Sequence, residues 1–144
     1  MSIKSIPLNS LSQRKLSQLQ SSIAIPPMYI SVEGFELVND LNAILYNIEI
    51  GLQKNQTVYA KICQRRYSSL QELDNSIRSQ FHDSPYLLPF PPKKIIGNKD
   101  PSFIEQRANQ LQIYLENLIK IPGVCTSSLF THFFDFIPAD FADL

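Results

Sequence analysis

The sequence lacks several features on which common classes of protein depend. It contains no tryptophan and only four glycines, and these glycines form no glycine-rich phosphate-binding loop. Its two cysteines, Cys63 and Cys125, lie far apart, form no CxxC motif and have no histidine at ligand spacing. We therefore expect no zinc site and no cofactor, and a reducing, cytosolic setting is the plain interpretation, with a single disulfide as the open alternative.

The chain also lacks an excess of either charge and any long apolar run. Thirteen basic and thirteen acidic residues give a formal net charge of zero, whereas proteins that bind nucleic acid usually carry a basic excess. No apolar run approaches the roughly 20 residues of a membrane span, and the amino terminus lacks the layout of a signal peptide. The 144 residues, 44% of them hydrophobic, predict one globular domain that does not bind nucleic acid.

Three stretches have the pattern of strands joined by short polar turns, which indicates an antiparallel meander. The first covers residues 28–38 with a break at Gly34, the second alternates apolar and polar residues over 44–53, and the third covers 57–66. Residues 1–27 are rich in Ser, Gln and Asn, and we expect a flexible or loosely docked leader there. The domain itself is expected to span 28–137, with 138–144 as a tail or the start of a linker.

Helical patterns follow the strands, separated by a long loop. Apolar residues recur at helical spacing after Tyr67, again after Pro101, and once more from about 127 to 136. Ser69 with Glu72, and Ser102 with Glu105, have the spacing of capping boxes. Between the first two helices, residues 82–100 contain four prolines and no periodicity. The fold class expected is α+β, with a three-stranded antiparallel sheet packed against a helical subdomain and a long proline-rich loop between helices one and two.

Three cations border apolar surface in this arrangement. If Val58, Ala60 and Ile62 face the core, alternation along the strand draws Arg66 inward and points Arg65 toward water. Lys94 follows the proline loop, and Arg107 borders the apolar stripe of the second long helix. Cations gathered without carboxylates repel one another, so the pattern favours a multiply charged anion, and the guanidinium fork suits phosphate.

The sequence resembles the PX (phox homology) domain, a phosphoinositide-binding module, in three separate places. Residues 65–70 (Arg-Arg-Tyr-Ser-Ser-Leu) look like the strand-to-helix motif of the family. Residues 88–94 fit its proline loop, and 103–107, followed by Leu111 and Tyr114-Leu115, resemble the helix that supplies the last basic residue. Leu70 stands where the family usually has an aromatic residue. Each motif alone is weak, but all three occur in the family's order.

The resemblance implies a role for each matching position. Arg66 would bind the 3-phosphate of phosphatidylinositol 3-phosphate, Tyr67 would pack on the inositol ring, Lys94 would contact the 1-phosphate, and Arg107 would bond the 4- and 5-hydroxyls. The apolar residues that the family inserts into the bilayer correspond to Ile95 and Ile96. It further implies a cytoplasmic protein, peripheral on the cytosolic face of endosomal or vacuolar membranes.

Other interpretations stay open beside this one. Arg66 and Arg107 could have purely structural partners, Tyr67 could be core, and Lys94 a solvated lysine. Pro89 and Pro92 form a PxxP pattern that also fits a ligand for an SH3-containing protein, and a PX fold can serve as a protein-interaction module with weak or lost lipid binding. An enzyme is not expected, because His82 and His132 lie in different elements and neither has an evident catalytic partner.

Overall fold

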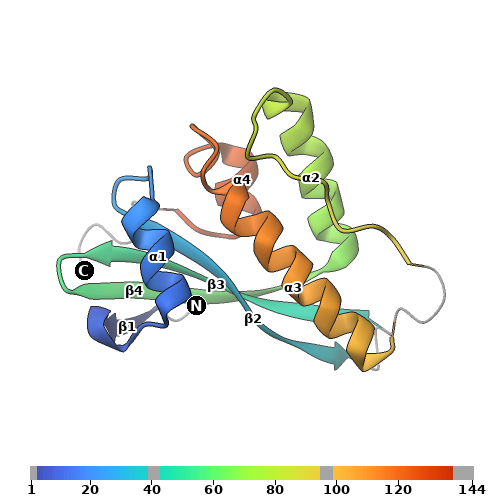
Figure 1. Cartoon of the computed structure of the whole chain (residues 1–144), viewed down its shortest axis with the longest axis horizontal. Coiled ribbons are helices and arrows are strands. Elements are labelled where there is room, and N and C mark those ends of the chain that lie inside the picture. Colours follow the sequence, from blue (N-terminus) through green and yellow to red (C-terminus); the bar gives the residue numbers. More distant parts are fainter. Residues whose placement is uncertain (1–2, 39–42, 95–98, 138–144) are drawn as a thin grey trace.

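The computed structural model describes residues 3–38, 43–94 and 99–137, and it has the α+β architecture that the sequence predicts (Figure 1). In chain order the elements are β1 (Lys4–Pro7), the short 3-10 helix η1 (Leu8–Ser10), α1 (Gln13–Ser21), β2 (Met28–Val38), β3 (Ala43–Lys54), β4 (Thr57–Arg66), α2 (Tyr67–Phe81), α3 (Pro101–Leu118) and α4 (Ser128–Phe133).

The strands form a four-stranded antiparallel sheet with the order β1-β4-β3-β2. The expected meander of β2, β3 and β4 is present, and β2 has a register shift between Val32 and Gly34, at the break that the sequence indicates. The expectation of three strands is wrong by one, because β1 pairs with the outer edge of β4, from Lys4 opposite Ala60 to Pro7 opposite Thr57.

Residues 4–21, in the segment predicted to be a flexible or loosely docked leader, form regular elements. Besides β1 they form α1, which begins at Ser12, whose hydroxyl accepts a hydrogen bond from the Lys15 amide. Leu19 of α1 packs with Tyr29, Val58 and Ala60 in a small second core. This segment contains few apolar residues. Their side chains pack on an apolar face of the sheet, and the burial of this apolar surface stabilises the ordered segment.

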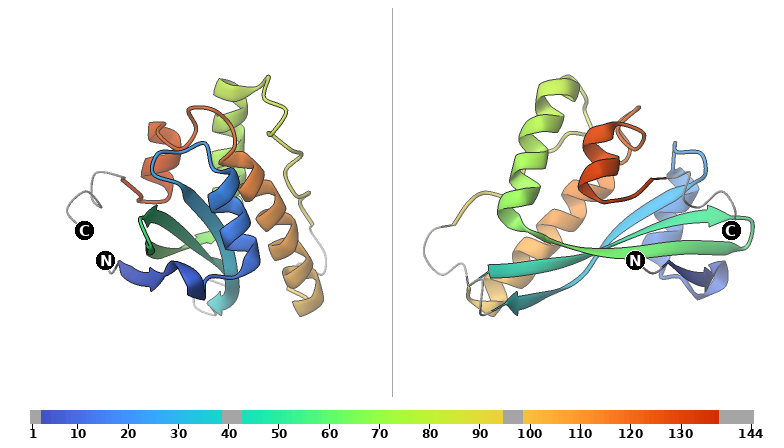
Figure 2. Two further views of the ribbon diagram at one scale, coloured as in Figure 1. Left: turned by 60° about the vertical axis from the view of Figure 1, so that its left-hand side comes forward. Right: turned by 180° about the vertical axis from the view of Figure 1, so that it is seen from behind.

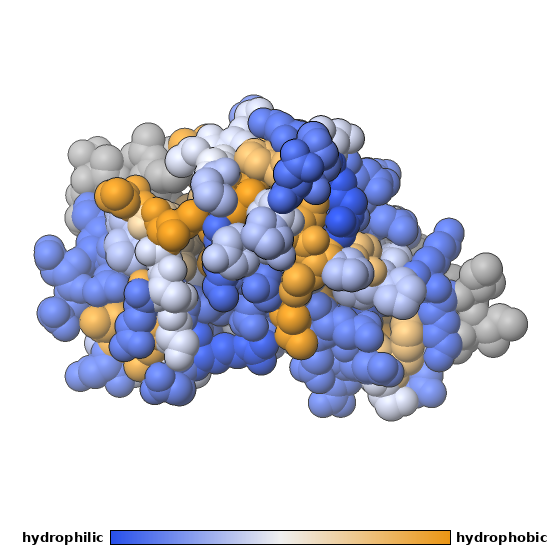
Figure 3. Space-filling view, turned by 45° about the horizontal axis from the view of Figure 1, so that its top comes forward, coloured by the Kyte–Doolittle hydropathy of each residue, from blue (hydrophilic) through white to orange (hydrophobic). Residues whose placement is uncertain are grey.

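The main core lies on the opposite face of the sheet, under α2, α3 and α4 (Figure 2). Alternate residues of β3 point into it, as the sequence predicts: Tyr46, Ile48, Ile50 and Leu52 are each at most 2% exposed. The helical stripes meet them there with Leu70, Leu73, Ile77, Ile104, Leu111, Leu115 and Leu118. On the face drawn in Figure 3, hydrophobic residues appear in separate groups on an otherwise mostly hydrophilic surface.

The side of β4 that faces the helices is the reverse of the one expected. Tyr59 and Cys63 pack against the main core, whereas Val58 and Ala60 belong to the second core and Ile62 is 45% exposed. The prediction assumed that β4 has one buried face. Apolar side chains of the amino-terminal segment also pack on the other face, so strand alternation alone could not show which face of β4 meets the helices.

Helix starts differ from the expected capping boxes. Helix α2 begins two residues before Ser69, with Arg66 as its N-cap and no side-chain cap. Helix α3 begins with Pro101 after Asp100, whose carboxylate accepts hydrogen bonds from the amide and the hydroxyl of Ser102. The Ser-x-x-Glu spacing occurs in both helices, but its serine lies three residues after the N-cap in α2 and two residues after it in α3.

Candidate functional site

A pocket of about 280 Å³ opens at one end of the sheet, where β3 starts, β4 ends, and the proline loop meets α2 and α3. Its wall contains two arginines and two lysines and no carboxylate among the lining residues, which are Ala43, Ile44, Tyr46, Arg66, Tyr67, Ser68, Lys93, Lys99 and Arg107. A hollow with cationic walls that lacks internal anions attracts an anion from outside.

Arg66 reaches this pocket because it is the last residue of β4 and the N-cap of α2, so the chain turns out of the sheet there. Its side chain is exposed and lines the pocket, and no hydrogen bond or ion pair holds it within the described part of the chain. The structural partner that the alternative interpretation of Arg66 requires is thus not among those residues.

Arg107 lies opposite on α3 and is 6% exposed, which agrees with the predicted position at the edge of the helical stripe. Its guanidinium carbon stacks 3.8 Å from the ring centroid of Tyr67 and 4.5 Å from that of Phe103. One terminal nitrogen donates to the Pro92 carbonyl at 3.2 Å. Its buried Nε has no hydrogen-bond partner among the described residues, so one donor of this cation is unsatisfied.

Tyr67 joins the pocket to the proline loop. Its hydroxyl donates to the Pro91 carbonyl at 2.7 Å, and its ring lies 5.3 Å from the ring of Phe90. Burial raises the pKa of the Tyr67 hydroxyl, although the charge of Arg107 opposes the shift. Tyr67 therefore stays a neutral hydrogen-bond donor, and with Arg107 on one side of its ring it shapes one wall of the pocket.

Buried Tyr46 forms the floor beside Arg107. It is 1% exposed and lines the pocket from β3. Burial raises the pKa of its hydroxyl, and the nearby charge of Arg107 acts in the opposite direction. The alternation over residues 44–53 predicts only that Tyr46 faces the core, because this pattern carries no sign of the pocket above the residue.

Lysines are placed differently from the prediction. Lys94 does not line the pocket; its Nζ lies 4.4 Å from the ring centroid of Phe103, a ring that it shares with Arg107. Lys93 and Lys99, to which the sequence motifs assign no role, do line it. The predicted membrane-insertion residues Ile95 and Ile96 lie outside the described residues.

Arg65, expected to point toward water, is instead held on the helical side of β4. Its Nε and Nη2 both donate to the Phe133 carbonyl, at 3.0 and 2.7 Å, and its guanidinium lies 5.4 Å from the Phe133 ring centroid. Of the two adjacent arginines, one therefore anchors α4 to the sheet and the other faces the pocket.

The proline loop is fixed in place through its carbonyl groups. Arg78 of α2 donates to the Leu88 carbonyl and also pairs with buried Asp74, which accepts a 2.6 Å hydrogen bond from Tyr114. The carbonyls of Pro91 and Pro92 are taken by Tyr67 and Arg107 as described. Pro91 is buried, whereas Pro89 and Pro92, the two prolines of the PxxP pattern, are exposed.

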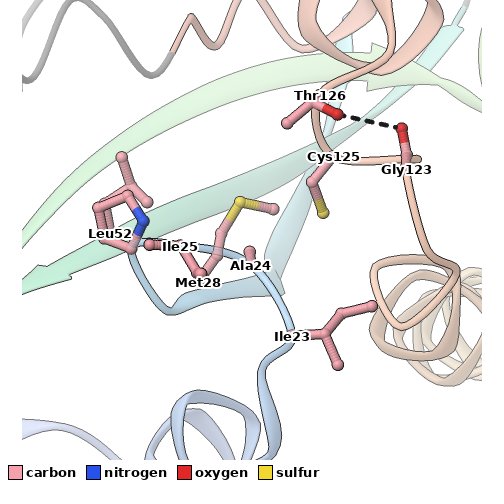
Figure 4. A pocket seen from close by; sticks show the side chains of 9 residues that line it. Ile23, Ala24, Ile25, Met28, Leu52, Gly123, Cys125 and Thr126 are labelled. Atoms are coloured by element: carbon pink, nitrogen blue, oxygen red, sulfur yellow. Dashed lines mark hydrogen bonds between the residues drawn. The ribbon is translucent and has the colours of Figure 1, made fainter.

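A second pocket, of about 270 Å³, lies near the other end of the sheet (Figure 4). Its wall is mostly apolar and is formed by Ile23, Ala24, Ile25, Pro26, Met28, Leu52, Gly123, Cys125 and Thr126. Burial raises the pKa of the Cys125 thiol there to about 12, so the thiol is protonated. Leu52 is six residues from Tyr46 along β3, about 20 Å at 3.3 Å per residue, so the two pockets are separate.

The described residues contain no group of three or more His, Cys, Asp or Glu side chains that could hold a metal ion. Within the same residues, no helix has the length and apolarity needed to cross a membrane.

Known proteins resemble this chain both in sequence and in fold. The profile of the PX domain family matches residues 53–136, more than half of the chain. The PX domain-containing protein kinase-like protein of Rattus norvegicus is 38% identical over 109 residues, which is 76% of this chain and 18% of that protein. Sorting nexin-31 of Mus musculus is 38% identical over 71 residues, which is 49% of this chain and 16% of that protein. The chain thus spans less than a fifth of the length of these relatives.

Two solved structures share the fold. A designed CISK-PX domain superposes with a TM-score of 0.62 at 20% identity and covers 74% of this chain and 97% of its own. The mouse SNX19 PX domain with a bound sulphate ion has a TM-score of 0.56 at 20% identity, covering 76% of this chain and 97% of its own. At this identity the likeness concerns the fold alone.

Proposed function

The chain belongs to the PX domain family, and from that premise we propose that it is a membrane-targeting module that binds phosphoinositides in the pocket of Arg66 and Arg107. PX domains are in general phosphoinositide-binding modules. The observation that carries the proposal is the wall of this pocket. Among the described residues it combines an exposed Arg66, two lysines and a buried Arg107 whose Nε has no partner there, and the lining residues include no carboxylate.

An inositol phosphate headgroup fits this chemistry. Leaving a buried donor such as the Arg107 Nε unpaired costs about 1–3 kcal/mol, and a ligand oxygen removes that cost. Arg66 offers a fork of donors that matches two phosphate oxygens. In the arrangement that we propose, Arg66 binds the 3-phosphate of phosphatidylinositol 3-phosphate, the Tyr67 ring borders the inositol, and Arg107 bonds the 4- and 5-hydroxyls.

The 1-phosphate, which connects the headgroup to the bilayer, is assigned to the lysines at the end of the proline loop. Lys94 keeps the role that the family resemblance implies, and Lys93, which lines the pocket, is added to it. We further propose that the protein is peripheral on the cytosolic face of endosomal or vacuolar membranes, and that it binds without catalysing a reaction.

The test is the substitution Arg66→Ala. We expect it to weaken binding to vesicles that contain phosphatidylinositol 3-phosphate by more than tenfold, because a charge-assisted contact is worth about 1.5–3 kcal/mol. Co-sedimentation across a panel of phosphoinositides measures the loss and the headgroup preference together. The matched control is Arg14→Ala, which removes a surface arginine on α1, and thermal unfolding checks that both variants fold. Unchanged co-sedimentation of the Arg66 variant would refute the proposal.

A second candidate function is favoured by the exposure of Pro89 and Pro92. Prolines three apart on an extended segment are the pattern that SH3 domains recognise. Against it, the carbonyls of Leu88, Pro91 and Pro92 already accept hydrogen bonds within the domain. If an SH3-containing protein does bind here, Pro89→Ala should abolish its binding while Arg66→Ala leaves that binding unchanged.

A further inference from the structure

The loop between α1 and β2 exposes two isoleucines at the second pocket. Ile23 is 54% exposed and Ile25 is 97% exposed, the highest exposed fraction of any large apolar side chain in the described part of the chain. Both residues line the pocket, whose wall is mostly apolar (Figure 4). Exposed apolar side chains gathered around an apolar hollow are typical of a surface that binds another protein.

Hydrogen bonds within the loop hold this exposed conformation. The Ser22 hydroxyl accepts a hydrogen bond from the Ala24 amide at 3.2 Å and another from the Met28 amide at 3.1 Å. These two bonds span the part of the loop that carries Ile23 and Ile25. Because the backbone is already ordered, a partner that covers the isoleucines pays little to order the loop.

The size and charge of the second pocket suit an uncharged apolar side chain. An apolar cavity of about 150 Å³ is enough for a molecule of the size of benzene, so the pocket of about 270 Å³ has room for an isoleucine side chain. No Asp, Glu, Lys or Arg is among its lining residues, and the Cys125 thiol is protonated as described. Two copies of one surface carry the same charge and repel one another unless the surface is neutral, so this surface can meet its own copy without that cost.

We infer that two copies of this chain pair through this surface, with Ile25 of each copy inserted into the second pocket of the other. In a pair with two-fold symmetry the same patch faces itself, so the patch must carry both the projecting side chain and the hollow that receives it. The second pocket and Ile25 meet this requirement together, and this favours a second copy over a different protein. The inference does not depend on headgroup binding, because the cationic pocket is separate from this surface and stays open in the pair.

Analytical ultracentrifugation of the whole chain tests the pairing. We expect a reversible dimer at concentrations on the order of 10–100 µM, because a small interface gives a weak affinity. Ile25→Asp should raise the dissociation constant of the dimer more than a hundredfold, since the substitution occurs twice in each dimer and burial of one isoleucine is worth about tenfold or more.

The matched control is Ile113→Asp, which makes the same replacement on α3, where Ile113 is 48% exposed and does not line the second pocket. This variant should keep the dissociation constant of the unchanged protein, and thermal unfolding checks that both variants fold. An unchanged protein that stays monomeric up to about 1 mM, a concentration at which even a very weak pair forms, would overturn the inference. Equal losses in the two variants would overturn it as well.

The absence of tryptophan provides an independent measurement. The emission of Ile25→Trp should shift to the blue as the protein concentration rises, because the ring enters the apolar pocket of another copy. The emission of Ile113→Trp should stay the same at every concentration. A blue shift of Ile25→Trp that does not depend on concentration would mean that the ring enters the pocket of its own chain, and would refute the inference. The absence of any shift would refute it too, because the side chain at position 25 would then face water.

Discussion

At the scale of single residues, the site depends on how differently its two arginines are held. Arg107 is buried between the rings of Tyr67 and Phe103 and is tied to the Pro92 carbonyl, so its position is fixed before a ligand arrives. Arg66 is exposed, and no hydrogen bond or ion pair holds it within the described residues. In the proposed complex, Arg107 is therefore a preorganised wall, whose ordering costs little on binding, while Arg66 supplies a charge that the ligand must order.

The two lysines at the end of the proline loop allow a test at this scale. Lys93 lines the pocket, whereas the Lys94 ammonium lies over Phe103. We expect Lys93→Ala to weaken binding of soluble inositol 1,3-bisphosphate more than Lys94→Ala does, while each weakens vesicle binding by about 1 kcal/mol through the lost attraction to anionic lipid. Calorimetry and co-sedimentation measure the two effects. A larger headgroup loss for Lys94→Ala would show that Lys94 turns into the pocket when ligand binds.

At the scale of elements, ion pairs hold the amino-terminal segment of β1 and α1. In each pair this segment supplies the cation and the rest of the domain supplies the carboxylate. Lys4 and Lys15 both lie within 2.8 Å of the Glu49 carboxylate, and Arg14 binds Glu116 of α3 through two bonds of 2.9 Å. Glu49 is 0% exposed, and its second hydrogen bond comes from the Tyr29 hydroxyl at 2.7 Å. Lys4 is within ion-pair distance but outside hydrogen-bond geometry, so its attraction is mainly Coulombic.

Glu49 and Glu33 both contact Lys15, but one is buried and the other partly exposed. We expect Glu49→Ala to lower the free energy of unfolding by about 3 kcal/mol, because it leaves the Lys15 ammonium and the Tyr29 hydroxyl without their buried partner. Glu33→Ala should cost less than about 1 kcal/mol, as exposed pairs do. Urea unfolding measures both. Equal costs would show that the buried carboxylate does not hold the segment. Headgroup binding should be unaffected in either variant.

At the scale of the whole molecule, the two ends of the sheet carry different structural features. One end carries the cationic pocket, and the other carries β1, α1 and the second pocket (Figure 1). The carboxylates that hold β1 and α1 in place, Glu49 and Glu116, do not line the cationic pocket. Protonation of these two groups should therefore lower the stability of the domain without a direct effect on the pocket.

The direction of this acid effect follows from two carboxyl groups. Burial acts to raise the pKa of Glu49, but the contacts with Lys15, Lys4 and Tyr29 outweigh it and the pKa is lowered; the pKa of Glu116 is lowered in the same way by its contacts with Arg14 and Gln112. A lowered pKa in the folded state contributes stability above the unfolded value of about 4.3, and that stability is lost as the pH falls further. We expect unfolding free energy to be insensitive to these groups near neutral pH and to fall below about pH 4.

Unfolding measured as a function of pH checks this expectation. Glu49→Ala should make the acid part of the profile shallower, because one of the two responsible carboxyls is gone. An acid profile that is identical in the variant and the unchanged protein would contradict the assignment.

Much of the fold and part of the site could be predicted from the sequence, because both depend on local patterns. Alternation along β3 and the helical stripes fixed which side chains enter the main core. The break at Gly34 marked the register shift of β2, and the residue order around Arg66, Tyr67 and Arg107 marked the family and the pocket. Each of these signals lies within a few consecutive residues, where backbone geometry alone decides which side chains share a face.

Only the tertiary structure decided the rest, because it depends on partners distant in the chain. The sheet has a fourth strand because Lys4 to Pro7 pair with the free edge of β4. Apolar side chains of the amino-terminal segment pack on the face of β4 that carries Val58 and Ala60, so the other face of β4 meets the helices. Lys93 rather than Lys94 lines the pocket because the proline loop is fixed through carbonyl groups by Arg78, Tyr67 and Arg107, which no local pattern records. The charges and the alternation of apolar residues can be read from the sequence. Which residues contact one another depends on how segments that are distant in the sequence pack on the same surface.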